Sequence, residues 1–309
     1  MIQAVFYTLG QVIVPIAIPV MAGWLLRKKF GLDTGPLMTI TLYVLVPALV
    51  FDALMKAELN PGMIGSTLAF CTLNILLMWL IAYLWSRLLR LSAPDRAGLG
   101  LIATTTNSVN YGIPLILMAF GQTGMDFAAV YVIIGMILMN TVSVYIAARS
   151  HFSVRDAILS VFKLPAVYAA ALAGVLKLLD VQVPAGLASG ISMLATALPP
   201  LVLMVLGSQM AGVRKGDTDG GSRKTFWSGL AIRMLVAPAV AAPILWALGI
   251  KGIQFMVLLI LASMPVAVNA VILAEKFDAS PKVLAKCILW TTLASFIVLP
   301  LVIGIGVGA

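Results

Sequence analysis

Charged side chains are scarce in this sequence of 309 residues: only 10% are Asp, Glu, Lys or Arg, whereas 62% are hydrophobic. A soluble domain carries roughly 25% charged residues, so the composition excludes an ordinary soluble fold. Together with a mean hydropathy of +1.10, it predicts an all-α protein that crosses a membrane several times.

Histidine and cysteine are almost absent as well, at one and two residues. His151 lies in a charged loop, and Cys71 and Cys287 lie in apolar segments, so we expect neither a disulfide nor a metal site. The apolar segments contain no histidine, Gly-x-Ser-x-Gly or His-Glu-x-x-His motif, which argues against an intramembrane hydrolase. We therefore expect no catalytic residues, no enzymatic activity and no cofactor.

Apolar windows of about 20 residues predict ten transmembrane helices. Their approximate bounds are 3–26, 36–55, 62–86, 97–120, 124–148, 160–178, 185–211, 226–248, 253–274 and 283–306. No basic region precedes the first apolar run, so we expect that run to span the membrane rather than to be a cleaved leader.

The lysines and arginines predict the orientation of these spans. Most of the 20 lie in the loops after the odd-numbered spans, whereas Lys56, Lys177 and Lys251 lie on the opposite side. The positive-inside rule then places both termini on the periplasmic side of a bacterial inner membrane. Topology thus accounts for the net charge of +9, and we expect no nucleic-acid partner.

Prolines recur along the chain at an interval of about 150 residues, which indicates an internal repeat. The matching pairs are Pro36 with Pro184 at span starts, and Pro47 with Pro199 and Pro114 with Pro265 at predicted helix breaks. Each repeat, 1–150 and 151–309, holds five spans, so the second must be inverted relative to the first. Inverted repeats with interrupted helices are typical of secondary transporters, with the substrate near the midplane.

A polar run at residues 104–114 lies in the middle of the fourth span, and its counterpart at residues 263–269 lies in the ninth. Such polarity is costly at this depth and usually functional. A structural proline kink is the alternative, but the repeat favours two functional breaks. We expect the second half-helices to start there, with Asn110 and Ser263 as N-caps.

Two half-helix N-termini that meet at one point would bind an anion without a buried lysine or arginine. The first half-helices end at the same point, so a cation site remains an alternative. The expected substrate-contacting residues are Asn107, Asn110, Tyr111, Ser263 and Asn269, and the expected break residues are Gly112, Pro114 and Pro265.

Other polar residues of the spans admit two interpretations each. Asp52 and Lys56 form an i,i+4 ion pair at the outer interface or a proton or cation site. Arg233 extends to the cytoplasmic surface or lines an anion path. Asn74 forms a hydrogen bond between helices or contacts the substrate.

The polar motifs resemble those of the auxin efflux carrier family, which includes the plant PIN exporters and bacterial carriers described as malonate or malate permeases. The resemblance is carried by residues 46–51, 107–116 and 263–277. It implies the ten-helix inverted-repeat fold of PINs and bile-acid symporters, with crossing breaks in the fourth and ninth spans. It also implies a scaffold of the first, second, sixth and seventh spans, through which a homodimer forms, and a mobile transport part from the other six.

Within this resemblance, Asn107 corresponds to the substrate asparagine, and Asn269 follows the bacterial pattern. The chain lacks the long cytoplasmic loop of many PINs, so a small dicarboxylate such as malonate is favoured over auxin. We therefore expect an elevator-type secondary transporter of small organic anions. A sodium-coupled symporter of the bile-acid kind and a non-transporting anion receptor remain alternatives, and the coupling ion, proton or sodium, stays open.

Overall fold

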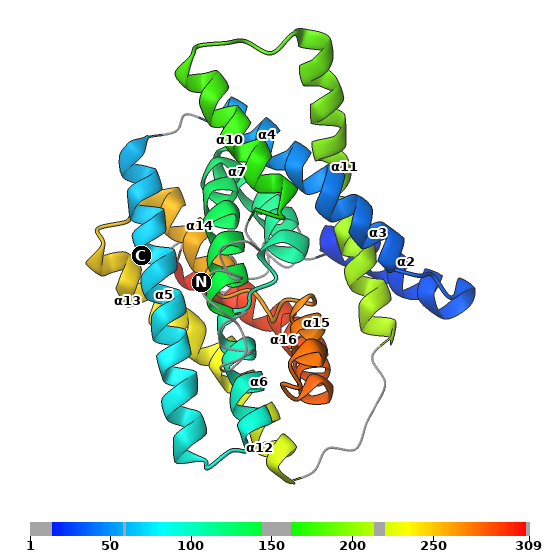
Figure 1. The fold of residues 1–309 in the computed structure, drawn as a ribbon, viewed down its shortest axis with the longest axis vertical. Helices are drawn as coiled ribbons and strands as arrows, with labels where there is room; N and C mark the ends of the chain where they lie inside the picture. Colours follow the sequence, from blue (N-terminus) through cyan, green and yellow to red (C-terminus); the bar gives the residue numbers. More distant parts are fainter. Residues whose placement is uncertain (1–13, 58–59, 144–161, 213–219, 307–309) are drawn as a thin grey trace.

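The structure is a computed structural model that describes residues 14–57, 60–143, 162–212 and 220–306 (Figure 1). Every regular element in these ranges is a helix. The α-helices are α2 (Val14–Phe30), α3 (Gly35–Ile40), α4 (Val46–Lys56), α5 (Pro61–Leu88), α6 (Ala93–Thr104), α7 (Ile113–Leu138), α10 (Pro165–Leu178), α11 (Ala185–Gly212), α12 (Gly220–Ala231), α13 (Ala237–Ala247), α14 (Gly252–Ala262), α15 (Ala270–Lys276) and α16 (Pro281–Gly306). Four π-helical turns lie between or beside them: η2 (Thr41–Leu45), η3 (Ser108–Gly112), η4 (Met139–Ser143) and η5 (Ile232–Val236).

Six helical segments in the described ranges are long and apolar enough to cross a membrane. They are 35–56, 61–88, 108–138, 185–212, 223–247 and 281–304, and two shorter apolar helices are α10 and α14. These segments confirm an all-α membrane protein in the described part of the chain. The full set of ten spans in two inverted repeats stays a prediction, since parts of the first, fifth and sixth expected spans lie outside the described residues.

The helices of the expected scaffold pack against one another in the upper and right part of Figure 1. There α2 packs along α11, while α4 packs against both α10 and α11. Glycines allow the closest of these contacts, because a Cβ atom at Gly23 would lie 1.8 Å from the carbonyl oxygen of Met204. A Cβ atom at Gly207 would lie equally close to the carbonyl oxygen of Val20. Small residues at such contacts are typical of helix packing in membranes.

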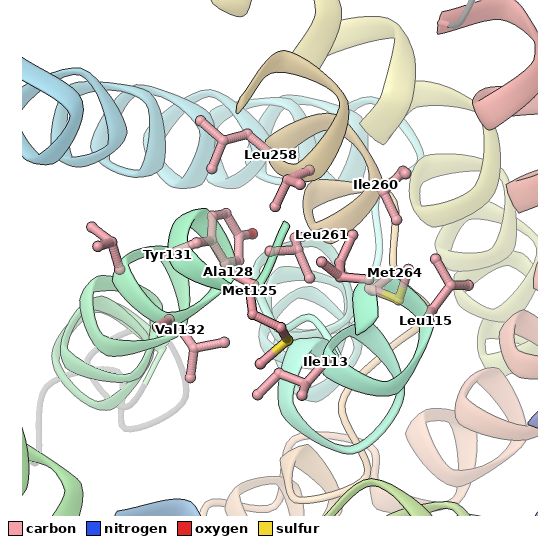
Figure 2. Close-up of a cluster of buried hydrophobic side chains, with 14 of the residues drawn as sticks. Ile113, Leu115, Met125, Ala128, Tyr131, Val132, Leu258, Ile260, Leu261 and Met264 are labelled. Atoms are coloured by element: carbon pink, nitrogen blue, oxygen red, sulfur yellow. The ribbon is translucent and has the colours of Figure 1, made fainter. Parts of the chain in front are cut away.

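A second group of helices packs around α7 and α14 (Figure 2). Leu258, Leu261 and Met264, at and just after the end of α14, contact the start of α7 near Ile113 and its later part near Tyr131. Between these parts α7 changes direction at Gly121, whose φ of 60° is a conformation open mainly to glycine. This core therefore holds the ends of two interrupted helices close together.

The expectation that Pro199 breaks a helix is wrong. The helix α11 continues from Ala185 to Gly212 through both Pro199 and Pro200. Prolines are tolerated within membrane helices when neighbouring groups satisfy the carbonyls that they free. The expected break at Pro47 is wrong too, since the helical segment 35–56 continues through it. There the π-helical turn η2 directly precedes α4 and locally widens the helix.

Candidate functional site

The two polar runs found in the sequence lie where helices are interrupted. The helix α6 ends at Thr104, and the chain becomes helical again at Ser108. The helix α14 ends at Ala262, and α15 begins at Ala270. The non-helical residues between them, 105–107 and 263–269, are called the crossover below.

The two segments of the crossover pair with each other through their backbones. Thr106 and Val266 form an isolated antiparallel bridge. The N–H of Asn107 donates to the carbonyl of Pro265 at 2.9 Å, and that of Ala267 donates to the carbonyl of Thr105 at 3.3 Å. Each break therefore supplies hydrogen-bond partners for backbone groups of the other break. Non-helical backbone at membrane depth needs such partners within the protein.

The expected N-cap at Ser263 is wrong. Ser263 is the residue directly after α14, at its C-cap, and its hydroxyl donates to the carbonyl of Leu259 at 2.7 Å. Pro265 accordingly lies in the non-helical segment rather than in the first turn of the next helix. That helix, α15, has only seven residues, so its N-terminal dipole is small.

The expected N-cap at Asn110 is wrong as well. Asn110 lies inside the π-helical turn η3, and Asn107 occupies the position before that turn without a side-chain cap. Pro114 does lie in the first turn of α7, as expected. Gly112 ends η3 with an ordinary helical φ of −64°, so its role is to allow a close approach to Leu261 and not an unusual backbone conformation.

A cavity of about 1670 Å³ lies beside the crossover. Its lining includes Asn107 and Asn110 from the first break and Asn269 from the second. It also includes Asn74 of α5 and Tyr131 of α7. From the sequence, Asn74 could either bond to another helix or contact the substrate, and Tyr131 was not predicted to be a site residue. Amide side chains from α5 and from the two breaks thus line one space.

Tyr111 and Ser263 do not belong to the described lining of this cavity. The ring of Tyr111 is fully buried and lies against Phe296, with the ring centroids 6.0 Å apart. Ser263 is also buried, with its hydroxyl turned to its own helix. The structure therefore brings three of the five expected contact residues to the cavity and holds the other two behind its wall.

Arg233 is the largest fully buried side chain of the described residues, with 1% of its surface exposed. It lies in η5, and its Nη1 donates to the carbonyl of Ala103 at 2.7 Å while its Nη2 donates to the carbonyl of Ala262. These carbonyls belong to the last turns of α6 and α14. The interpretation that Arg233 extends to the cytoplasmic surface is therefore wrong. The expectation of an anion site without a buried arginine is wrong as well. Charge-assisted hydrogen bonds to two helix ends hold the guanidinium inside the protein.

Several polar atoms of the cavity lining are buried and have no hydrogen-bond partner among the described residues. The donors are Nδ2 of Asn107 and Nε of Arg233, and the acceptors include Oδ1 of Asn74 and Oε1 of Gln209. An unsatisfied buried group costs roughly 1–3 kcal/mol. A polar ligand or water that reached these atoms would remove that cost.

The outer part of the cavity is basic. Arg27, Lys282 and Lys286 line it together with one acidic residue, Glu275. All four lie at the side that the positive-inside rule predicts to be cytoplasmic. A surplus of positive charge along an opening raises the local concentration of anions.

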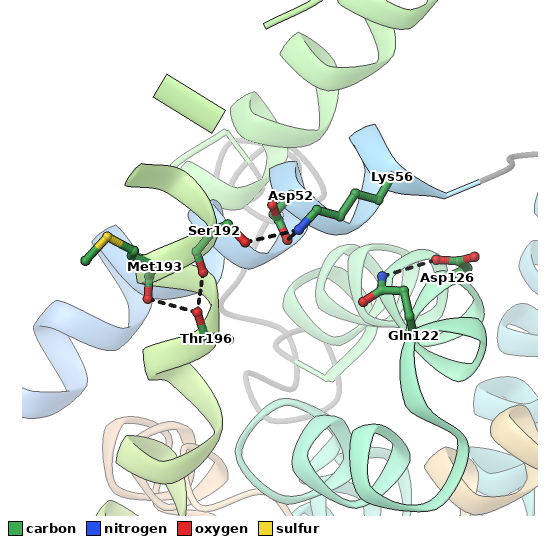
Figure 3. Close-up of polar contacts among 7 residues, drawn as sticks. All are labelled: Asp52, Lys56, Gln122, Asp126, Ser192, Met193 and Thr196. Carbon is green, nitrogen blue, oxygen red and sulfur yellow. Dashed lines mark hydrogen bonds and ion pairs between the residues drawn. The ribbon is translucent and has the colours of Figure 1, made fainter. Parts of the chain in front are cut away.

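Asp52 and Lys56 form an ion pair with 2.7 Å between Nζ and Oδ2, as the i,i+4 interpretation predicted (Figure 3). Lys56 also donates to the hydroxyl of Ser192 in α11 at 3.1 Å. Neither partner of the ion pair lines the large cavity. Within the described ranges, no group of three or more His, Cys, Asp or Glu side chains could hold a metal ion.

Comparison with known proteins adds independent information. A family model described as membrane transport protein matches residues 148–303, half of the chain. The chain is 28% identical to an uncharacterized transporter of Methanothermobacter thermautotrophicus, over 96% of this chain and 98% of that protein. It is 26% identical to an uncharacterized transporter of Methanocaldococcus jannaschii, over 94% and 96% respectively. A shorter match of 28% identity joins 40% of this chain to 19% of auxin efflux carrier component 2 of Oryza sativa subsp. japonica.

Proposed function

This chain belongs to the auxin efflux carrier family of membrane transport proteins, and we propose that it carries small organic anions across the membrane as a secondary transporter. The anion binds at the inner end of the cavity, beside the crossover. Malonate-like dicarboxylates are the substrate class that we favour.

The observation that carries this proposal is the pair of unpartnered donors, Nδ2 of Asn107 and Nε of Arg233, in the lining of one cavity. Both atoms donate and neither accepts, so they select a ligand that is rich in acceptors. Arginine stays protonated in proteins, so Nε of Arg233 is a charge-assisted donor, although the ends of α6 and α14 balance much of the guanidinium's charge. The acidic residue of the described lining, Glu275, is exposed in the outer part.

The size of the cavity supports an access path rather than a closed pocket. Pockets that enclose a small ligand have volumes of about 300–1000 Å³, and this cavity is larger, at about 1670 Å³. A small anion would occupy only its inner end and leave the basic outer part open. In our proposal this arrangement is the state of the transport cycle that faces the cytoplasm.

The movement that we propose is of the elevator type, with α2, α3, α4, α10 and α11 as the stationary scaffold. The glycine-mediated packing of α2 on α11 supports a rigid scaffold. The scaffold touches the rest of the molecule mainly where α4 and α11 contact α7 and η3. We also propose a homodimer through the scaffold, and a bacterial inner membrane location with periplasmic termini.

Uptake of labelled malonate and related dicarboxylates into proteoliposomes tests the proposed function. The substitution Asn107→Ala should lower uptake at least tenfold, because it removes a donor that has no other partner. Asn60→Ala is the matched control, since Asn60 is exposed and accepts a hydrogen bond from the N–H of Gly62 at the start of α5.

Wild-type uptake in Asn107→Ala would contradict the proposed site. Binding of malonate without any flux would instead favour the anion receptor. An uptake profile limited to other anions would leave the transport proposal in place and replace its substrate.

A further inference from the structure

Arg233 lies where two helix C-termini converge. Its two Nη atoms donate to carbonyls in the last turns of α6 and α14, which come from different halves of the chain. Each helix C-terminus carries roughly half a negative charge, so the pair amounts to about −1. The guanidinium balances that charge with a single positive charge that belongs to the protein.

We infer that Arg233 is a resident cation that takes the position of a coupling sodium ion at the crossover. This inference rests on the proposed function of the site. It adds that Arg233 determines whether transport requires sodium. Carbonyls at the C-terminal ends of half-helices are the groups that coordinate sodium in transporters with broken helices. Here the carbonyls of Ala103 and Ala262 accept hydrogen bonds from the guanidinium instead.

The acidic side chains nearby in sequence do not offer a second place for sodium. Neither residues 99–114 nor residues 255–274 contain Asp or Glu, and Glu275, which follows, is exposed in the last turn of α15. Asp95 lies in the first turn of α6, at the opposite end from the crossover. Its carboxylate accepts hydrogen bonds from the hydroxyls of Ser92 and Ser280.

The same guanidinium also borders the proposed anion site. Its Nε has no partner among the described residues, and Arg233 belongs to the cavity lining. One side chain therefore neutralises the two helix ends and leaves one donor for the substrate. Because the cation is covalently attached, it moves with the crossover, and transport of the anion requires no sodium gradient.

Thermal unfolding of the purified protein tests this inference without a substrate. We expect equal midpoints for the wild type in NaCl and in N-methyl-D-glucamine chloride at the same concentration. Arg233→Gln removes the charge and should lower the midpoint by about 5 °C or more. Sodium, but not the organic cation, should restore part of that loss, because the two carbonyl ends then need a cation.

Two further variants accompany this measurement. Arg233→Lys keeps a positive charge and should show no response to sodium. Arg87→Gln is the matched control, because Arg87 is exposed and bonds to the hydroxyl of Tyr83 on its own helix. If Arg233→Gln does not fold, the wild type and Arg233→Lys still decide the question by their response to sodium.

Stabilisation of the wild type by sodium, or a loss in Arg233→Gln that sodium does not restore, would overturn the inference. Malonate uptake by the wild type should also stay within twofold when sodium is replaced on both sides of the membrane, and a tenfold fall would overturn it equally. Absence of uptake and binding in every medium would count against the proposed function, whereas the unfolding data would still test Arg233.

Discussion

The backbone N–H of Asn107 donates to the carbonyl of Pro265 at 2.9 Å, which joins the two helix breaks directly. Proline lacks an N–H of its own, but its carbonyl remains a full acceptor. A displacement of one break would leave both buried groups without their present partners, at a cost of roughly 1–3 kcal/mol for each group that stays unpaired. The two breaks are therefore expected to move as one unit with Arg233, which bonds to the helices that precede both.

The contact between α2 and α11 predicts a strong effect of a single methyl group. Gly207→Ala would place Cβ 1.8 Å from the backbone carbonyl oxygen of Val20. Because the obstructing atom belongs to the backbone, the clash can be relieved only if α2 and α11 move apart. We expect a loss of about 3 kcal/mol or more in unfolding free energy, measured by thermal or denaturant unfolding in detergent.

The matched control lies on the same helix. Gly190→Ala meets no atom within 4 Å, so the better helix propensity of alanine should leave stability unchanged or slightly raised. Equal stabilities of the Gly207 and Gly190 variants would contradict the close contact.

The sequence was sufficient to predict the two interruptions at 105–107 and 263–269, where polar residues accompany a proline in an apolar span, but it wrongly predicted a break at Pro199, which has no such polar run. It did not predict the local geometry after Ala262. Proline is only statistically preferred in the first turn of a helix. Here hydrogen bonds to a segment that is distant in the sequence override that preference. Residues 105–107 pair with the segment that contains Pro265, which therefore stays non-helical, and the next helix starts only at Ala270.

The position of Arg233 could not be predicted for a similar reason. An arginine near the cytoplasmic end of a span can extend to the surface, and nothing in the neighbouring sequence indicates another partner. Its partners, Ala103 and Ala262, are 130 and 29 residues away in the chain. They become visible only when both breaks are folded together, whereas the pair Asp52–Lys56 is local and was predicted from its spacing.

That local pair leads to a prediction of a small effect. Lys56 is half exposed in the ion pair, and exposed i,i+4 pairs contribute about 0.3–0.5 kcal/mol. Lys56→Met should lower the free energy of unfolding by no more than about 1 kcal/mol. The difference between the variant and the wild type should be smaller at high salt, and malonate uptake should be unchanged. Loss of uptake would instead support the alternative of a proton or cation site at Asp52.

Gly112 provides a prediction for the break in the first half of the chain. A Cβ atom there would lie 2.6 Å from Cδ2 of Leu261, a flexible side chain at the end of α14. Gly112→Ala should therefore fold, with a loss of about 1–3 kcal/mol in unfolding free energy as Leu261 shifts. The double variant with Leu261→Ala removes the obstructing atom, and the sum of the two separate losses should exceed the loss in the double variant. Strict additivity would show that the two residues are not in contact.

The basic outer part of the cavity predicts a dependence of uptake on salt. Lys282 is exposed and lines the cavity, so Lys282→Gln should lower the initial rate of malonate uptake severalfold at low ionic strength. The difference should shrink at about 0.5 M salt, where the screening length falls below 5 Å. Lys276→Gln is the matched control, because Lys276 is exposed at the end of α15 but does not line the cavity. Equal effects of the two substitutions would show that overall charge, rather than the charge beside the opening, governs the rate at which the anion enters.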